Sequence, residues 1–394
     1  MAAVREPRVG EIPLVRLALV GTGAWGLVLA RAAAGSTRLR ITCCVGRDPT
    51  RLARFVEATG IPPAASYEDV LRDPEIDGVL LTLPNEMHLP FARRAAAAGK
   101  HVYVEKPVAN TLEDGLAVTA LEHEHGVHIA VGHCARFLTG TRLIRAMIDQ
   151  GRLGTVNLIE AAFCNDRGLR LSPDDWRWYS DRSPGGCLSQ IAIHQFDTLR
   201  YLGGDLHSVS ATCAHRSPLP AEVEDQWLVS VAFADGKQGS VTSSWTSPGR
   251  YDLRVTGDRA SAFYEIDQAY WGDAGRLHLG ARLYVQERGQ GIATREAIVV
   301  PPGDMFRDEL EQFADAIVLD RAPEISAANG LQALAAVYAA LASARAGGQA
   351  HSIAATITAT IAATDVAAAG GAGGSEPACL TAHAPAPQPA GVST

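Results

Sequence analysis

The chain has 394 residues and a net charge of −8, with 47% hydrophobic and 20% charged residues. This length suggests two domains, since single domains centre on ~100–200 residues, and the apolar content is ample for two cores. The acidic balance argues against binding along nucleic acid, and no run approaches the ~18 apolar residues of a membrane span, so we expect neither kind of partner.

A strand, a glycine turn and a helix follow a loose leader at residues 1–13. Val15–Val20 is a mostly apolar strand, residues 21–26 read G-T-G-A-W-G, and residues 27–34 favour a helix. A G-x-G-x-x-G motif in this setting is typical of dinucleotide-binding proteins, because its glycines permit a tight turn and let the backbone approach a pyrophosphate. The helix N-terminus then offers free N–H groups to the phosphates. The alternative is a glycine-rich turn that holds no ligand.

Strands and helices continue to alternate as far as residue 132. We expect further strands at residues 39–45, 78–83, 101–105 and 127–131, and helices at residues 49–60, 86–99 and 112–125, with a short one opening at residue 66. This βαβ rhythm predicts a Rossmann dinucleotide-binding domain over residues 14–137, an α/β fold with a parallel, doubly wound sheet. Ligands of such sheets bind at the carboxyl ends of the strands.

The pattern changes after residue 137. We expect helices at residues 141–150, 187–202, 306–319 and 330–346, a strand at residues 155–165, and strand after strand from residue 208 to about residue 300. This succession predicts an α+β domain over residues 138–350, with a large, mostly antiparallel sheet and a helix layer. Residues 367–394 are rich in Gly, Ala and Pro and predict a disordered tail.

The residues after the second strand bear on which dinucleotide binds. An acid ~20 residues past the glycines would hold the adenosine ribose diol. Gly46 and Arg47 stand there, and an arginine fork suits a ribose 2′-phosphate. This favours NADP(H), with NAD(H) as the other possibility. In the alternative interpretation Arg47 is a solvated turn residue and Asp48 takes the ribose.

Two further segments carry groups suited to proton transfer. Lys106 ends the strand V-Y-V-E-K-P, where a lysine facing a nicotinamide acts as acid or base if its pKa is lowered. Gln190, His194 and Asp197 fall at i, i+4 and i+7, so one helix face carries all three. The structural alternatives are an ordinary exposed lysine and a hydrogen-bonded core histidine.

The histidines and cysteines do not predict a metal site. His123, His125, His128, His133 and Cys134 are close in sequence, but they fall on different elements and no carboxylate pattern accompanies them. The seven cysteines include no C-x-x-C pair, and they are typical of reduced thiols in a cytoplasmic protein.

Taken together, these motifs resemble the glucose–fructose oxidoreductase/inositol dehydrogenase family, Gfo/Idh/MocA. The landmarks are GTGAWG, LPNEMH at residues 83–88, AGKHVYVEKP at 98–107, VGHCARF at 131–137 and GGCLSQIAIHQFD at 185–197. The resemblance implies an open C-terminal sheet whose free face forms homodimers or homotetramers. It also implies reversible hydride transfer between a nicotinamide and a secondary alcohol of a sugar, cyclitol or related ring. Lys106 matches the catalytic lysine, and His194 matches the histidine that contacts the reacting hydroxyl.

The motifs and the resemblance together assign residues to the site. Catalysis falls to Lys106, His194 and Gln190. The cofactor contacts are expected at Gly21, Thr22, Gly23, Ala24, Trp25, Gly26, Gly46, Arg47, Leu83, Pro84, Asn85, His88, Glu105 and Lys106. The substrate contacts are expected at Lys106, Arg136, Asn165, Trp176, Gln190, His194 and Asp197, and Asp166, Arg167, Arg177 and Trp178 are expected to shape the pocket.

Two departures from the family pattern leave the substrate open. Gln190 stands where the family commonly has Asp, and Ala192 where it commonly has Gly. Glutamine can orient a substrate or Lys106 but cannot take a proton. The leading interpretation is an NADP-dependent oxidoreductase. The alternatives are an NAD-dependent cyclic diol dehydrogenase and a non-catalytic nucleotide sensor of the same fold.

Overall fold

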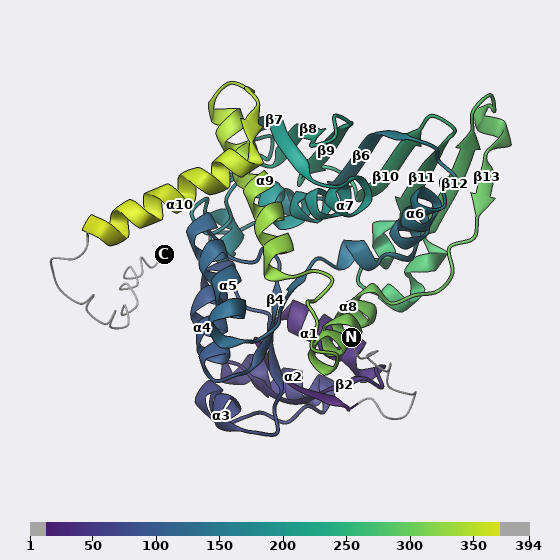
Figure 1. Cartoon of the computed structure of the whole chain (residues 1–394). Coiled ribbons are helices and arrows are strands. Elements are labelled where there is room, and N and C mark those ends of the chain that lie inside the picture. The colour runs from purple at the N-terminus through teal and green to yellow at the C-terminus, as the bar shows by residue number, and fades with distance from the viewer. Residues whose placement is uncertain (1–12, 371–394) are drawn as a thin grey trace, which may run out of the picture.

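The computed structural model describes residues 13–370 and confirms a Rossmann-type domain followed by a domain built on a large sheet (Figure 1). The expected leader lies almost wholly outside the described residues. So does most of the expected tail, although helix α10 (Ile353–Gly370) runs past the expected boundary at residue 367. No element was predicted between residues 351 and 366, where this helix begins.

The N-terminal domain is a five-stranded parallel sheet in the order β2-β1-β3-β4-β5. Its strands are β1 (Val15–Val20), β2 (Leu39–Val45), β3 (Gly78–Leu81), β4 (His101–Glu105) and β5 (Ile129–Gly132). Its helices are α1 (Ala24–Ala34), α2 (Pro49–Thr59), α3 (Tyr67–Arg72), α4 (His88–Ala97) and α5 (Leu112–His125). The chain order reverses between β1 and β3, and this reversal opens a crevice at the carboxyl ends of those strands.

The second domain is a nine-stranded sheet in the order β13-β12-β11-β10-β6-β9-β8-β7-β14. Only the β6–β9 pair is parallel, which confirms the mostly antiparallel prediction. The strands are β6 (Val156–Cys164), β7 (Leu206–Ala214), β8 (Gln226–Phe233), β9 (Gln238–Ser244), β10 (Arg250–Gly257), β11 (Ala260–Ile266), β12 (Ala281–Glu287), β13 (Glu296–Ile298) and β14 (His351–Ser352).

Helices cover one face of the large sheet and leave the other face open. Helices α6 (Thr139–Asp149), α7 (Ile193–Gly203) and α9 (Ala327–Arg345) lie on the side that faces the N-terminal domain (Figure 1). Side chains alternate accordingly along β8, where Trp227 and Val229 are buried and Leu228 is 62% exposed. Burial on a single face gives the period-two alternation that is typical of an antiparallel sheet with one open face.

The last helices return to the N-terminal domain. Helix α8 (Met305–Val318) packs on α1, with the rings of Trp25 and Phe306 5.6 Å apart, and α9 packs on α5. The N–H of Val131 in β5 donates to the carbonyl of Ile325 at 2.9 Å. Chain segments from both ends of the sequence therefore complete the first domain.

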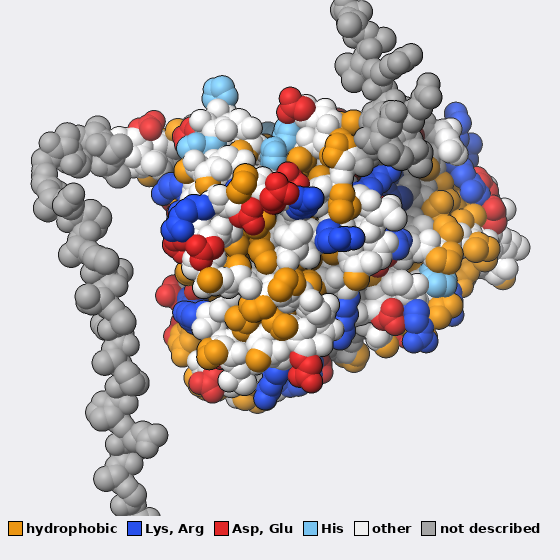
Figure 2. Space-filling view, turned by 90° about the horizontal axis from the view of Figure 1, so that it is seen from below, with side chains coloured by type: hydrophobic (Ala, Val, Ile, Leu, Met, Phe, Trp, Pro, Cys, Tyr) orange, Lys and Arg blue, Asp and Glu red, His pale blue; other side chains and the backbone are white. Residues whose placement is uncertain are grey.

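Helix α9 is long and apolar enough to cross a bilayer, with a mean hydropathy of 1.2, although the sequence pattern suggested no such run. In the structure 67% of the apolar stretch of α9 is buried. The helix packs against the large sheet and α5, as the core helix of a globular domain does. Seen from the side of the N-terminal domain, acidic and basic side chains are interspersed over the surface (Figure 2).

Candidate active site

The glycine turn after β1 has the geometry that a dinucleotide requires. Gly21 has φ +110°, and a Cβ at Gly21 would lie 2.5 Å from the Thr82 carbonyl oxygen. A Cβ on Gly26 would lie 2.2 Å from the Gly21 carbonyl oxygen, whereas Gly23, which caps α1, has open space around it. The first and last glycines thus close the turn against the sheet, and the middle one leaves room for a phosphate beside the helix N-terminus.

A cavity of about 760 Å³ lies at the carboxyl ends of β1, β2 and β3. Seven of the residues predicted to bind the cofactor line it: Gly21, Thr22, Gly23, Gly46, Arg47, Leu83 and Pro84. The size of this cavity and the shape of the glycine turn fit a nicotinamide dinucleotide. Gly46 is in close contact with Thr22, since a Cβ there would lie 2.5 Å from Oγ1 of that threonine. Any side chain at position 46 would therefore require Thr22 to move.

The side chain of Asp48 makes a hydrogen bond within the protein, whereas that of Arg47 is exposed. Asp48 caps α2 by accepting a hydrogen bond from the Arg51 backbone N–H at 3.0 Å. Arg47 is exposed on the cavity rim, and within residues 13–365 neither Arg47 nor Arg51 has a carboxylate within ion-pair distance. The rim therefore offers guanidinium groups where the ribose would lie.

Several residues predicted to contact the cofactor lie away from this cavity. His88 is buried, with its ring nitrogens 3.0 Å from the Leu83 carbonyl and 2.9 Å from the Pro107 carbonyl, so the single N–H of the neutral ring donates to one of the turns after β3 and β4 while the ring contacts both. Burial lowers the pKa of His88. Asn85 donates to the Arg182 carbonyl at 3.4 Å, and Glu105 is buried behind Lys106. These groups shape the turns.

A second cavity, of about 200 Å³, lies between the two domains. Its lining contains the three predicted catalytic residues and Asn165, for which a substrate contact is expected. The described lining residues are Trp25, Lys106, Phe163, Asn165, Arg167, Arg177, Gln190, Ile191, His194, Trp245, Gln268 and Trp271. Trp25 was assigned to the cofactor by its place in the glycine motif, and the structure places it in this second cavity.

Lys106 is held by a local irregularity of the second domain. Its Nζ donates to the backbone carbonyl of Gln190 at 2.6 Å. Gln190 belongs to a π-helical turn, Leu188–Ala192, which precedes α7 where the sequence predicted one continuous helix. π-turns recur at functional sites because they displace carbonyls from the regular ladder. The contact therefore depends on the backbone at position 190.

Burial sets the protonation of the catalytic candidates. It lowers the pKa of Lys106 to about 8, although the neighbouring Glu105 carboxylate acts in the opposite direction. The pKa of Glu105 is raised to about 7, again mainly by burial. Burial also lowers the pKa of His194 well below its usual value, and the charge of Lys106 adds to this effect. His194 is therefore a neutral imidazole near pH 7.

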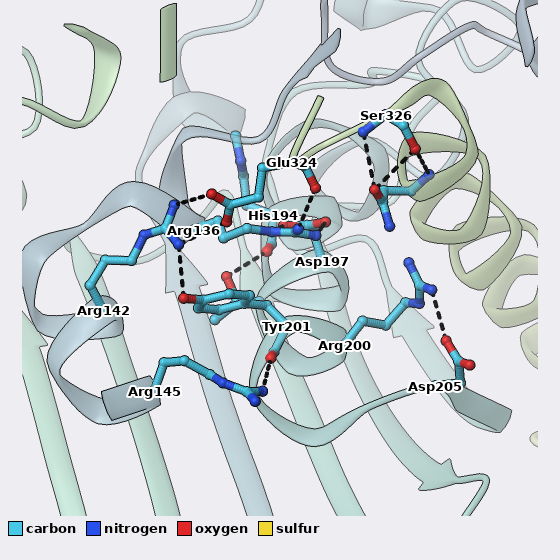
Figure 3. Close-up of polar contacts among 12 residues, drawn as sticks. Arg136, Arg142, Arg145, His194, Asp197, Arg200, Tyr201, Asp205, Glu324 and Ser326 are labelled. Carbon is cyan, nitrogen blue, oxygen red and sulfur yellow. Dashed lines mark hydrogen bonds and ion pairs between the residues drawn. The ribbon is translucent and has the colours of Figure 1, made fainter. Parts of the chain in front are cut away.

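Two predicted substrate residues form a buried ion pair instead. The Nε of Arg136 donates to an oxygen of Asp197 at 3.0 Å, and its Nη1 donates to the Glu324 carbonyl at 3.0 Å (Figure 3). Neither Arg136 nor Asp197 lines the cavity, because Asp197 lies beyond the π-turn and faces the segment before α9. We therefore replace their predicted substrate role with a structural one.

Trp176 also differs from its prediction. The Cζ of Arg177 lies 4.1 Å from the centre of the Trp176 ring, and Arg177, not Trp176, lines the cavity. Sequence reasoning missed Phe163, Ile191, Trp245, Gln268 and Trp271. Phe163 could have been found from the alternation along β6, but Gln268 and Trp271 lie in an irregular segment without a periodic signal.

No group of three or more metal-ligating side chains converges anywhere in the described part of the chain. The arrangement is instead a basic group of lowered pKa and a neutral imidazole in one cavity, beside a dinucleotide-shaped cavity. It suits proton transfer to or from a substrate hydroxyl near a nicotinamide.

Comparison with known proteins agrees with this geometry. The model of an oxidoreductase family with an NAD-binding Rossmann fold matches residues 15–133, and that of a GFO/IDH/MocA C-terminal domain matches residues 141–263. A 1,5-anhydro-D-fructose reductase from Ensifer adhaerens is 27% identical over 326 residues, 79% of this chain and 93% of the relative. A scyllo-inositol 2-dehydrogenase (NAD(+)) from Bacillus subtilis (strain 168) is 32% identical over 259 residues, 63% of this chain and 73% of the relative.

A solved structure extends the match over both domains. An oxidoreductase from Desulfitobacterium hafniense DCB-2 superposes with a TM-score of 0.83 at 31% identity, covering 88% of this chain and 99% of that one. The resemblance inferred from the motifs is thereby confirmed. The chain belongs to the GFO/IDH/MocA family of NAD-binding oxidoreductases.

Proposed function

We propose that this protein transfers a hydride between NADP(H) and a secondary alcohol or ketone of a sugar, cyclitol or related ring. The observation that carries the proposal is the convergence of Lys106, Gln190 and His194 in a cavity next to the dinucleotide turn. The names of the relatives, an anhydrofructose reductase and an inositol dehydrogenase, support the ring substrate.

The chain's own residues account for the proton. A bound nicotinamide supplies hydride transfer. Lys106, with a pKa near 8, is poised to take the hydroxyl proton in oxidation and to return it in reduction. The neutral His194 holds the reacting oxygen by a hydrogen bond, and the Gln190 side chain orients the substrate.

We propose NADP(H) over NAD(H) because of the ribose rim. A side chain at position 46 would meet Thr22, and Arg47 lies on the rim with no carboxylate within ion-pair distance among residues 13–365. A guanidinium without a carboxylate partner favours a 2′-phosphate through charge-assisted hydrogen bonds.

The test of the reaction is an assay of the purified protein with a panel of sugars, cyclitols and keto sugars, with both cofactors. Turnover is expected on at least one ring. Lys106→Ala is expected to lower kcat by ~10²–10⁴ and to leave cofactor binding nearly intact, because general acid–base groups contribute about that much. Cofactor binding without turnover on any ring would instead indicate a nucleotide sensor.

We also propose a homodimer or homotetramer, formed through the open face of the large sheet. This face carries the exposed Leu228 among serine and threonine side chains and is hollowed by cavities of about 330 and 530 Å³. A cytoplasmic location is supported by the cysteines of residues 13–365, all of which are free thiols.

A further inference from the structure

The charged side chains in the described lining of the substrate cavity all have the same sign. They are Lys106, Arg167 and Arg177, and the remaining polar side chains there are amides and His194. Neutral sugars are usually bound by a mixture of donors and acceptors, since each hydroxyl both donates and accepts. A lining that is rich in cations is instead suited to an anion.

The two arginines share one carboxylate, which lies outside the lining. Arg177 Nη1 is 3.4 Å from an oxygen of Asp175, and Arg167 Nη1 is 3.8 Å from the other oxygen. The same carboxylate also accepts the Arg177 backbone N–H at 3.0 Å. One negative charge at these distances does not balance two guanidinium groups, and most of their N–H donors have no partner within the described residues.

Arg177 is fixed in place rather than free in solvent. Its guanidinium stacks on Trp176, with Cζ 4.1 Å from the ring centre, and its side chain is 23% exposed. Ordering and partly burying a cation costs free energy unless an opposite charge pairs with it. A planar fork held in this way is complementary to the oxygens of a carboxylate or phosphate.

The pyrophosphate of the cofactor does not supply the negative charge that these arginines lack. The glycine turn, where the pyrophosphate would bind, lines the larger cavity, and neither Arg167 nor Arg177 belongs to the described lining of that cavity. The arginines face the space enclosed by Lys106, His194 and the aromatic side chains. This space, about 200 Å³, is smaller than the ~300–1,000 Å³ of pockets for drug-sized ligands and suits a single ring.

We infer that the ring substrate carries an anionic substituent, a carboxylate or a phosphate, which Arg177 and Arg167 bind while Lys106 and His194 hold the reacting hydroxyl. This inference rests on the proposed hydride transfer and adds the substrate's charge to it. The anionic group orients the ring, and the aromatic walls around it pack against the ring's C–H faces.

The experiment compares matched neutral and acidic rings on the full-length protein: glucose, glucuronate and glucose 6-phosphate, and galactose with galacturonate. An acidic member is expected to have a kcat/KM at least about tenfold above its neutral partner, as a charge-assisted hydrogen bond implies. The uronate and phosphate arms distinguish the two anionic groups. Binding is followed in parallel by quenching of tryptophan fluorescence, because three tryptophans line the cavity.

Two variants locate the effect. Arg177→Gln is expected to lower the acid-to-neutral ratio of kcat/KM by about 10- to 100-fold, mainly through KM. Arg177→Lys, which keeps the charge without the fork, should fall in between. Arg170→Gln is the matched control, because Arg170 is exposed, pairs with Asp166 and is outside the described lining; it should leave the ratio unchanged.

The outcomes separate this inference from the proposed function. Turnover of neutral rings at a kcat/KM equal to or above that of their acidic partners overturns the anionic substrate and leaves the hydride transfer standing. Preferential binding of the acids without any turnover supports the anion site and overturns the proposed reaction. An unchanged ratio in Arg177→Gln overturns the assignment to this arginine.

Discussion

Glu105 and Lys106 are adjacent in sequence, and together they set the pH range in which the lysine can accept a proton. The base needed for alcohol oxidation is the unprotonated amine, so kcat/KM for oxidation is expected to rise with pH through the pKa of Lys106, about 8. Burial moves this value down from the ordinary lysine range, and Glu105 limits the shift because its negative charge favours the ammonium form.

Glu105→Gln is expected to move that pH–rate profile to lower pH. Removing the carboxylate takes away the largest effect that raises the lysine's pKa, and an opposite charge at this range is worth about one unit or more. The measurement is kcat/KM for oxidation against pH. Glu309→Gln is the control, because Glu309 is a buried carboxyl that accepts a hydrogen bond from Tyr103 at 2.8 Å, and burial raises its pKa, which favours the neutral form. A profile that shifts equally in both variants would contradict the assignment.

The proposed preference for NADP(H) depends on one side chain, Arg47. Arg47→Ala is expected to weaken NADPH binding by about 1.5–3 kcal/mol, the worth of hydrogen bonds to a charged group, and to leave NADH binding nearly unchanged. Dissociation constants for both cofactors provide the measurement. Equal losses for the two, or a wild-type preference for NADH, would contradict the NADP proposal.

Single residues were predictable where a motif fixes their place in the fold. Lys106 follows a strand whose end must face the cofactor, so its position could be inferred from the sequence. Asp197 was misplaced because its partner Arg136 lies on a segment distant in sequence, and helical spacing does not reveal that pairing. The stacking of Arg177 on Trp176 joins sequence neighbours, but they lie in an irregular loop whose sequence has no periodic pattern from which the contact could be predicted.

At the scale of elements, strands were the most predictable. Strands β2 and β4 match the expected segments to the residue, and β8 to β13 fall within the run of strands expected from residue 208 to about residue 300. The π-turn before α7 was not predicted, since its residues differ little from those of an ordinary helix. Helix α10 was missed because threonines disfavour helix, yet Thr356 and Thr360 donate their hydroxyls to carbonyls four residues earlier.

Helix α10 divides the C-terminal region into two parts with different expected roles. Deleting residues 371–394, which have few large apolar side chains, is expected to preserve Tm and activity. Deleting from residue 353 onward should lower Tm by at least about 3 °C, because it removes the buried Ile353. Thermal melts of the two truncations make the comparison. A large loss of Tm in the shorter deletion would show that the tail stabilises the fold.

For the whole molecule, the open sheet face predicts the assembly. Leu228→Arg is expected to shift the protein to monomers while its circular dichroism stays native, because the side chain is 62% exposed within one chain. An arginine there would place an unpaired charge between subunits. Light scattering after size exclusion gives the mass. Leu14→Arg, at a leucine 38% exposed in the first domain, is the control, and dissociation in that variant too would contradict the assignment to the sheet face.

The change from alternating strands and helices to successive strands after residue 137 predicts two domains. It does not predict that the last helices of the chain pack on the first domain. Strand rhythm describes neighbours in sequence, whereas α8 and α9 pack on helices that precede them by roughly half the chain or more. Such contacts depend on the apolar faces that remain uncovered after the sheet has formed, and the local sequence pattern does not reveal those faces.

The pairing of β5 with the segment before α9 has a consequence for the order in which the protein folds. Val131 can pair with Ile325 only after strands β6 to β13 have been synthesised, and α9, which packs on α5, follows directly after Ile325. During translation the nascent nucleotide domain therefore presents an apolar flank for the time needed to make most of the remaining chain. Closing so long a loop is slow, and chaperone dependence in the cell would be concentrated in that interval.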